Sequence, residues 1–293
     1  MVSDLEAFEA WLREQDRSEV TVRGYLADMR QFARWFAQTH DQELRVDGVT
    51  PTDVREYRGW LQTVRRASAA TIRRRLMALR SYCRWGVAVG RVESDPTARL
   101  KIPREEPLSP RWLERGEQWR LVREAERGIQ AANTPQRRRL AVRDWSLVVF
   151  LLNTGLRVSE ACAIDVSDVQ MGERSGWVQV RSGKGAKARK VPLNAEARRA
   201  LKAWLEARGD APGRLFGITV SVLQRRLAEI GRRAGVEVHP HTLRHTMAKN
   251  LVDAGVGLHE VATLLGHSSL NATRVYITPG ERDLERALER IAE

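Results

Sequence analysis

Cysteine, aromatic residues and long apolar runs are all scarce in this chain of 293 residues. The two cysteines, Cys83 and Cys162, are too few and too far apart for a disulfide framework or a zinc site, so we expect both to be small core residues. The longest apolar run, residues 147–152, has six residues, whereas a membrane span needs roughly 18. The first residues, MVSDLEAFEAWLREQD, are acidic and amphipathic, unlike a secretory signal. We therefore predict a cytoplasmic protein that has no membrane partner.

Basic residues, in contrast, are abundant. The chain has 50 Lys and Arg against 37 Asp and Glu, which gives a net charge of +13. Residues 1–50 carry six basic and ten acidic residues, whereas residues 51–106 carry 13 basic and six acidic ones. A second basic block, residues 181–230, carries 12 basic and four acidic residues. Two such blocks suit an extended polyanion such as DNA, although solvated helix faces would give the same pattern.

The length of the chain predicts two domains, each large enough to bury its own core. Apolar residues of the first domain recur at helical spacing, with no alternating strand pattern. Four prolines then interrupt residues 96–110. We therefore predict a helical DNA-binding domain over residues 1–102, a linker over 103–110 and a second domain over 111–293.

The second domain combines helical patterns with one short β signal. Two strands, 177–181 and 188–193, flank a glycine-containing hairpin connection. The expected helices lie at 112–127, 139–152, 195–208, 220–234, 242–254 and 258–265, with a tail helix from about 281. The predicted class is therefore mainly α with a small antiparallel β-sheet.

In the first domain, two helices have informative ends or faces. Thr50, Pro51 and Asp53 are the residue types that favour the N-cap and first turn of a helix. The helix over 69–87 carries arginines at spacings of seven and four near one face, so it can lie along DNA. The candidate DNA contacts are Arg73, Arg74, Arg75, Arg80 and Arg84 and, in the second domain, Lys187 and Arg189.

Five of the six histidines fall within residues 239–267. Among them, His241 lies three residues before Arg244, so both share one face of the first turn of a helix. Unpaired N–H groups and the helix dipole favour a phosphate there, and the planar guanidinium of Arg244 can bind two phosphate oxygens. A histidine and an arginine that only cap or pair at a helix end would give the same spacing.

Two further cations stand in distinctive places. Arg157 comes five residues after the end of a buried apolar run, which gives it a rigid base, and Glu160 is placed to hold it. Lys184 lies between two glycines at the tip of the expected hairpin. A surface ion pair and an ordinary turn lysine are the plain alternatives.

The segment SGKGAK lacks the spacing of a phosphate-binding P-loop, and neither the histidines nor the carboxylates have the spacing of zinc or magnesium ligands. We therefore predict no cofactor and no metal. Without a metal, chemistry on a phosphodiester needs fixed cations that meet the developing charge, and a tyrosine can be the covalent nucleophile. Tyr276 is the only tyrosine of the second domain.

These residues, in their order along the chain, resemble the signature of the tyrosine recombinase (phage integrase) family. The segments that carry the resemblance are TGLRVSE, GKGAKARKVPL, HTLRHTMA and LLGHSSLNATRVY. Because no arm-binding module precedes the first helices, the chain looks most like the short Xer-type site-specific recombinases. The resemblance implies an N-terminal SAM-like core-binding domain and a mixed α+β catalytic domain with a tail helix, which together form a C-shaped clamp on DNA.

The resemblance also implies how the covalent step proceeds. Tyr276 would attack the scissile phosphate to form a 3′-phosphotyrosyl link and release a 5′-hydroxyl. His241 would act in proton transfer from the tyrosine, and Lys184 would protonate the leaving 5′-oxygen. Without such help a phenol with a pKa near 10 is a poor nucleophile.

The remaining site residues would serve the phosphate. By the same resemblance, Arg157 and Arg244 would stabilise the pentacoordinate transition state. His267 would hydrogen-bond the phosphate, and Glu160 would support the first cluster.

The implied partners are double-stranded DNA sites and further recombinase subunits. Exchange would pass through a Holliday junction in a synaptic tetramer, either of identical subunits or with a related recombinase. Dimer resolution and mobile-element integration or excision both stay open as biological tasks. The alternatives are a catalytically silent DNA-binding protein of the same fold, a type IB topoisomerase that relaxes DNA, and an architectural protein that coats DNA.

Overall fold

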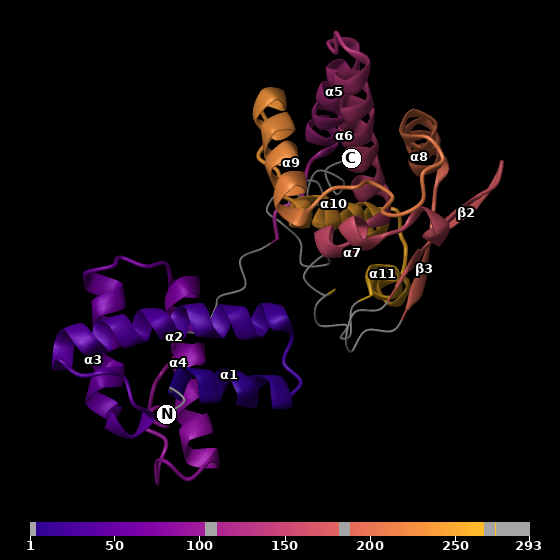
Figure 1. The fold of residues 1–293 in the computed structure, drawn as a ribbon. Coiled ribbons are helices and arrows are strands. Elements are labelled where there is room, and N and C mark those ends of the chain that lie inside the picture. Colours follow the sequence, from indigo (N-terminus) through magenta and orange to yellow (C-terminus); the bar gives the residue numbers. More distant parts are fainter. Residues whose placement is uncertain (1–3, 103–109, 182–187, 267–272, 274–293) are drawn as a thin grey trace, which may run out of the picture. The chain divides into compact units, whose positions relative to one another are not determined.

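The computed structural model of the chain describes residues 4–102, 110–181, 188–266 and 273 (Figure 1). The chain forms two compact units, Met1–Pro107 and Leu108–Glu293, and each has its own hydrophobic core. Residues 103–109 of the expected linker and the whole expected tail helix lie outside the described residues. The predicted domain boundaries stay a prediction, and the two units are described separately below.

Unit 1 is helical throughout its described residues. Its elements are α1 (Asp4–Glu14), α2 (Glu19–His40), the short 3-10 helix η1 (Val46–Gly48), α3 (Pro51–Thr63) and α4 (Ala69–Ala88). At the start of α3, the Thr50 hydroxyl accepts from the Asp53 backbone N–H at 3.3 Å, and the Asp53 carboxylate accepts from the Thr50 backbone N–H at 2.8 Å. The predicted beginning of this helix is therefore confirmed, and its reciprocal capping bonds satisfy two donors that the helix itself leaves unpaired.

Aromatic rings fill the core of unit 1. Phe32 of α2 meets Tyr57 of α3 edge-on with ring centroids 4.9 Å apart, and Phe8 of α1 meets Tyr82 of α4 at 5.4 Å. The first pair joins α2 to α3, and the second joins α1 to α4. Cys83 is buried here, as predicted, and burial raises the pKa of its thiol, so the group stays protonated.

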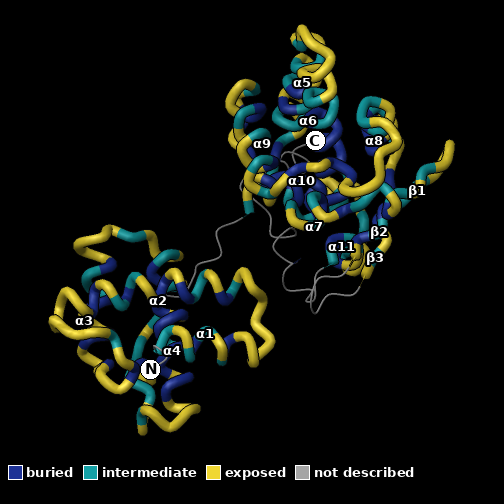
Figure 2. The backbone as a smooth tube through the Cα atoms, viewed as in Figure 1, coloured by how far each residue is buried: buried dark blue, intermediate teal, exposed yellow. Residues whose placement is uncertain are grey.

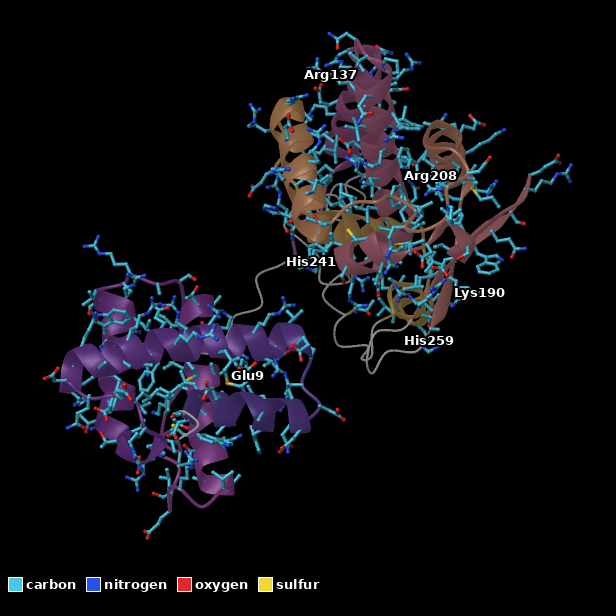
Figure 3. The ribbon with its side chains drawn as sticks, in the orientation of Figure 1. Glu9, Arg137, Lys190, Arg208, His241 and His259 are labelled. Atoms are coloured by element: carbon cyan, nitrogen blue, oxygen red, sulfur yellow. The ribbon has the colours of Figure 1, made fainter. Side chains whose placement is uncertain are left out.

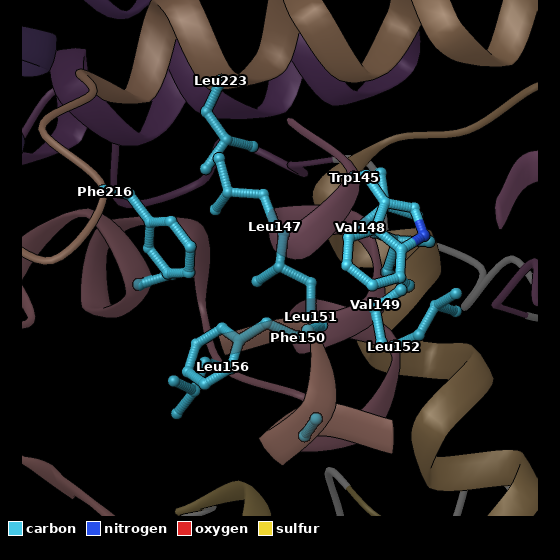
Figure 4. Packing of buried hydrophobic residues seen from close by; sticks show 14 of the residues in the cluster. Trp145, Leu147, Val148, Val149, Phe150, Leu151, Leu152, Leu156, Phe216 and Leu223 are labelled. Carbon is cyan, nitrogen blue, oxygen red and sulfur yellow. The ribbon is translucent and has the colours of Figure 1, made fainter. Parts of the chain in front are cut away.

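Unit 2 is built around one helix whose C-terminal half is buried. Its helices are α5 (Arg115–Gln130), α6 (Pro135–Thr154), α7 (Val158–Ala163), α8 (Ala195–Arg208), α9 (Val220–Ala234), α10 (Pro240–Asp253) and α11 (Leu258–Leu265), with a 3-10 turn η2 (Val166–Asp168). Residues 144–152 of α6 are buried without interruption, and α5, α8 and α10 pack around this helix (Figures 1, 2 and 4). Cys162 of α7 is only partly buried but packs against this core.

A small antiparallel sheet lies beside these helices. Its strands are β1 (Val169–Met171), β2 (Gly176–Val180) and β3 (Arg189–Pro192), in the order β1-β2-β3, with Val178 opposite both Val169 and Val191. The predicted class, mainly α with a small antiparallel sheet, is confirmed. The strand β1 was not predicted, because three residues are too few to show alternation.

The beginning of α6 also differs from the sequence prediction, which placed it at residue 139. The helix begins four residues earlier, at Pro135, with Thr134 as its N-cap: the Thr134 hydroxyl accepts from the Arg137 backbone N–H at 3.2 Å. A threonine before a proline is the same signal that marked α3. None of the helices in the described ranges is both long and apolar enough to cross a membrane.

Candidate active site

The candidate site of unit 2 forms where two helices end. Gly155 is the C-cap residue of α6 and Gly266 that of α11, and both glycines have the left-handed backbone (φ +61° and +66°) that favours glycine. A Cβ on Gly155 would lie 2.8 Å from Leu265 Cδ2, so this glycine also permits the two helix ends to approach each other. Each end presents carbonyl groups that the helix leaves unpaired and the negative end of its dipole.

Arg244 joins these two helix ends. Its side chain, on α10, is almost completely buried, with 4% of the residue exposed. One terminal nitrogen donates to the Gly155 carbonyl at 2.7 Å and the other to the Leu265 carbonyl at 2.8 Å. The guanidinium therefore has a fixed position and orientation before any ligand binds.

Arg157 and Glu160 form the second part of the site. Arg157 is the N-cap residue of α7; its Nη1 donates to Glu160 Oε1 at 3.0 Å, and its Nη2 donates to the Gly266 carbonyl at 3.2 Å. The other oxygen, Glu160 Oε2, accepts from the Arg157 backbone N–H at 2.9 Å. Glu160 thus holds both the main chain and the side chain of Arg157, as its spacing indicated.

Arg189 is the third guanidinium of this cluster. It forms a bidentate pair with Glu160, with nitrogen–oxygen distances of 3.0 and 2.9 Å, and its Nε donates to the Leu264 carbonyl at 3.1 Å. Burial would raise the pKa of the Glu160 carboxyl, but the bonds from Arg189 and Arg157 outweigh it and lower the pKa to about 2. Glu160 is therefore ionised at neutral pH and offsets the charge of the guanidinium groups around it.

The histidines of α10 differ in their surroundings. His241 is exposed in the first turn of the helix, where Figure 3 labels it. His245 lies one turn further on, with its ring centroid 6.4 Å from that of His241, and is half-buried. Burial, followed by the nearby His241 and Arg244, lowers the pKa of His245 to about 4, so its ring is neutral at pH 7.

Four predicted site residues, Lys184, Lys187, His267 and Tyr276, lie outside the described residues. Of the predicted site residues, the structure thus describes Arg157, Glu160, Arg189, His241 and Arg244. Within the described ranges, no group of three or more His, Cys, Asp or Glu side chains could hold a metal ion.

The predicted DNA contacts of α4 fall into two kinds. Arg74 is exposed and pairs with the buried Asp28, and Arg84 is exposed, with its Nε 3.7 Å from Asp95. Arg75 turns inward, with 14% of its side chain exposed. Arg80 donates to two main-chain carbonyls, those of Thr97 at 3.3 Å and Leu100 at 2.7 Å.

The structure thus places Arg75 and Arg80 within the packing of unit 1, and Arg73 lies on the same helix, partly exposed. Arg189 is likewise turned inward. The strand pattern of the sequence contains a signal for this orientation. Arg189 and the buried Val191 are two residues apart on a strand and share one face, whereas Lys190 is exposed on the other.

Comparison with known proteins places this site in a family. The chain matches the phage integrase family over residues 121–282 and the N-terminal SAM-like domain of phage integrases over residues 5–90. The chain belongs to the phage integrase family. "Tyrosine recombinase XerC" of Mycobacterium tuberculosis (strain ATCC 25177 / H37Ra) is 35% identical, over 94% of each chain, and that of Mycobacterium sp. (strain KMS) is 34% identical over the same shares.

Solved structures of the family share the fold. The XerH site-specific recombinase in a post-cleavage complex with a palindromic difH substrate has a TM-score of 0.73 at 20% identity, and the match covers 100% of this chain and 86% of that one. A lambda integrase (75-356) dimer bound to a COC′ core site has a TM-score of 0.69 at 17% identity, covering 95% of each chain. The family resemblance expected from the sequence is confirmed. The alternatives, a type IB topoisomerase, a catalytically silent DNA-binding protein and an architectural protein, are not favoured.

Proposed function

We propose that this chain of the phage integrase family is a site-specific DNA recombinase that cuts and rejoins double-stranded DNA through a 3′-phosphotyrosyl intermediate on Tyr276. The observation that carries the proposal is the pair Arg157 and Arg244, whose guanidinium groups are held by main-chain carbonyls and by Glu160. The relatives named tyrosine recombinases support the same activity.

In this proposal the two arginines bind the scissile phosphate. During the attack a pentacoordinate phosphorus forms and negative charge grows on its oxygens. Cations whose positions are already fixed meet this charge without any reorganisation during the reaction, which is an effective form of transition-state stabilisation. The burial of Arg244 strengthens the effect because less water screens the charge.

The proton steps would involve His241 and Lys184. Tyr276 loses its phenolic proton to His241 as its oxygen bonds to phosphorus, and the 5′-oxygen leaves with a proton from Lys184. His267 would hydrogen-bond a phosphate oxygen. Rejoining would reverse these steps, with a 5′-hydroxyl of the partner strand as the nucleophile.

The assembly would contain more than one subunit. The related structures include recombinases and integrases bound to DNA, one of them a dimer. We extend this to a synaptic tetramer that works through a Holliday junction, either with identical subunits or with a related recombinase. A C-shaped clamp of the two units on DNA and a cytoplasmic location belong to the same proposal.

The contacts with DNA outside the cleaved phosphate would come from basic side chains of both units. In unit 1 we assign these contacts to Arg73, Arg74 and Arg84, and in unit 2 to Lys187. The inward-turned Arg75, Arg80 and Arg189 have partners within their own units and are assigned to packing instead.

The decisive experiment uses nicked suicide duplexes taken from the DNA that adjoins the gene. A nick close to the cleavage site lets the short leaving fragment diffuse away, so a covalent complex accumulates. With EDTA present, the wild-type protein should form an adduct that resists SDS, and Tyr276→Phe should form none while it still binds the DNA. Tyr25→Phe, which removes a phenolic hydroxyl in unit 1, serves as the matched control and should retain the adduct.

Two results would reject the proposal. An adduct that persists in Tyr276→Phe would mean that another residue is the nucleophile. Tight binding without an adduct on every fragment, even after related recombinases are added as partners, would leave only a DNA-binding function.

A further inference from the structure

The last turn of α11 is held by three arginines from three different elements. The carbonyls of Leu264, Leu265 and Gly266, which are consecutive, accept bonds from Arg189 (3.1 Å), Arg244 (2.8 Å) and Arg157 (3.2 Å), respectively. The last carbonyls of a helix have no partner inside the helix, and these bonds give them one. The position of this turn therefore depends on all three side chains together.

Glu160 links two of these arginines. Both of its oxygens accept from Arg189, and one of them also accepts from the side chain of Arg157. Arg189 is thereby connected to Arg157 through the carboxylate and to α11 through the Leu264 carbonyl. A substitution of Arg189 would therefore loosen both Arg157 and the end of α11.

The guanidinium of Arg189 also lies against the glycine that ends α11. A Cβ built on Gly266 would be 2.8 Å from Arg189 Nη1 and 2.9 Å from its Cζ. Only 14% of the Arg189 side chain is exposed, so little of it is available to a phosphate of DNA. The next residue, Lys190, is exposed and has its ammonium 4.2 Å from the ring centre of Trp177.

We propose that Arg189 is a positioning residue of the active site: through Glu160 and the Leu264 carbonyl it fixes Arg157 and the end of α11, and it does not bind DNA. This inference rests on the proposed function, because the group that it positions is the phosphate-binding arginine. Gly266 directly precedes His267 in the chain, so the turn that Arg189 holds leads into another proposed site residue.

Lysine is the substitution that separates positioning from a DNA contact. A lysine keeps the positive charge and can still bind a phosphate as a point charge, but it lacks the planar fork that bonds both carboxylate oxygens and a carbonyl together. If Arg189 contacted DNA, Arg189→Lys would cleave almost normally. If it positions the site, Arg189→Lys should behave like Arg189→Gln.

The experiment measures two quantities for wild type, Arg189→Lys, Arg189→Gln and the control Lys190→Gln. The first is DNA affinity over a range of salt concentrations, and the second is the first-order rate of covalent adduct formation at saturating protein. We expect both Arg189 variants to form the adduct about 10- to 100-fold more slowly, as small misplacements of reacting groups do. Their affinity and its salt dependence should match wild type, and Lys190→Gln should form the adduct at the wild-type rate.

A wild-type rate in Arg189→Lys, or a lower affinity with a shallower salt dependence in Arg189→Gln, would overturn the inference. If the Arg189 variants fail to fold, Glu160→Gln tests the same contact from the other side, and a wild-type rate there would also overturn it. A thermal melt of each variant, with the rates measured well below the transition, separates positioning from lost stability alone.

Hydrogen exchange of the α11 amides keeps the inference testable independently of cleavage. Faster exchange in the last turn of α11 in Arg189→Lys, with unchanged exchange in Lys190→Gln, is the expected result, and unchanged exchange in both would contradict it. If wild type forms no adduct on any DNA, the proposed function fails, whereas a wild-type adduct with an unaffected Arg189→Lys refutes this inference alone.

Discussion

Arginine serves different purposes in the two units. On α4 of unit 1, the side chain of Arg84 is 68% exposed and its nearest carboxylate is 3.7 Å away. In unit 2, Arg244 is 4% exposed and donates to two main-chain carbonyls. The first side chain can move to follow a flexible polyanion, whereas the second can bind only a group that arrives at one fixed place.

The difference follows from what surrounds each guanidinium. A buried cation is costly unless it is paired, and unit 2 supplies two helix ends and one carboxylate for this purpose. The resulting cluster is rigid because each of its three arginines also donates to a carbonyl at a helix end. An exposed cation keeps its hydration and contributes to DNA binding through its charge alone, so its contribution weakens as the salt concentration rises.

The largest expected effect comes from Arg244→Gln. Removal of this guanidinium should slow adduct formation by about 10²- to 10³-fold, because the charge of the transition state loses a fixed donor. The free energy of unfolding of the variant should also be lower by about 1–3 kcal/mol, because the Gly155 and Leu265 carbonyls lose their donors. Suicide-substrate kinetics and urea denaturation measure the two losses.

The matched control for this prediction is Arg174→Gln, since Arg174 is exposed in the turn between β1 and β2. It removes the same charge from unit 2 and should change neither quantity measurably. If Arg244→Gln behaved like the control, the contrast between buried and exposed arginines would be wrong.

The second prediction compares a glycine of each unit. Gly155 and Gly90 both have a left-handed backbone (φ +61° and +72°), but a Cβ on Gly155 would meet Leu265 at 2.8 Å, whereas one on Gly90 would meet nothing within 4 Å. Alanine should cost about 1–2 kcal/mol at either position for the backbone alone. At Gly155 overpacking should add about 1–3 kcal/mol. Equal losses in thermal or urea unfolding would show that the helix ends of the site can separate without cost.

The third and smallest prediction separates two arginines on one helix. Arg80 and Arg84 lie one turn apart on α4, but only Arg80 donates to carbonyls of its own unit. Arg80→Gln should lower stability by about 1 kcal/mol. Arg84→Gln should leave stability unchanged and reduce the salt dependence of DNA binding by about one phosphate contact. The reverse pattern in unfolding and in salt titrations would assign the DNA contact to Arg80.

Much of the fold was predictable because it depends on local signals. The helical periodicities, the Thr50 cap and the hairpin strands all arise from residues close together in the chain, and the structure has them. The start of α6 and the strand β1 were missed for local reasons as well: one cap signal was overlooked, and one strand is too short to alternate.

The candidate site was predictable in part. Residue type and spacing predicted Arg157, Glu160 and Arg244 as site residues, because three-residue spacing on a helix places side chains together. The structure brings these three side chains to the ends of α6 and α11, and their roles stay a prediction. Spacing also assigned Arg80 and Arg189 to DNA, whereas each donates to carbonyls of its own unit. Periodicity predicts which face of a helix or strand a side chain occupies, but it does not predict which group from a distant part of the chain packs against that face.

The sequence by itself therefore determined the helical character of the chain, its family and the identity of its charged groups, since these depend on composition, order and short-range spacing. Only the tertiary structure decided which arginines are fixed by bonds to main-chain carbonyls. Leu264, Leu265 and Gly266 are 75, 21 and 109 residues from the arginines that bond them. Contacts across such separations arise from the packing of whole helices, and main-chain carbonyls are present at every residue, so no sequence pattern marks the three that matter.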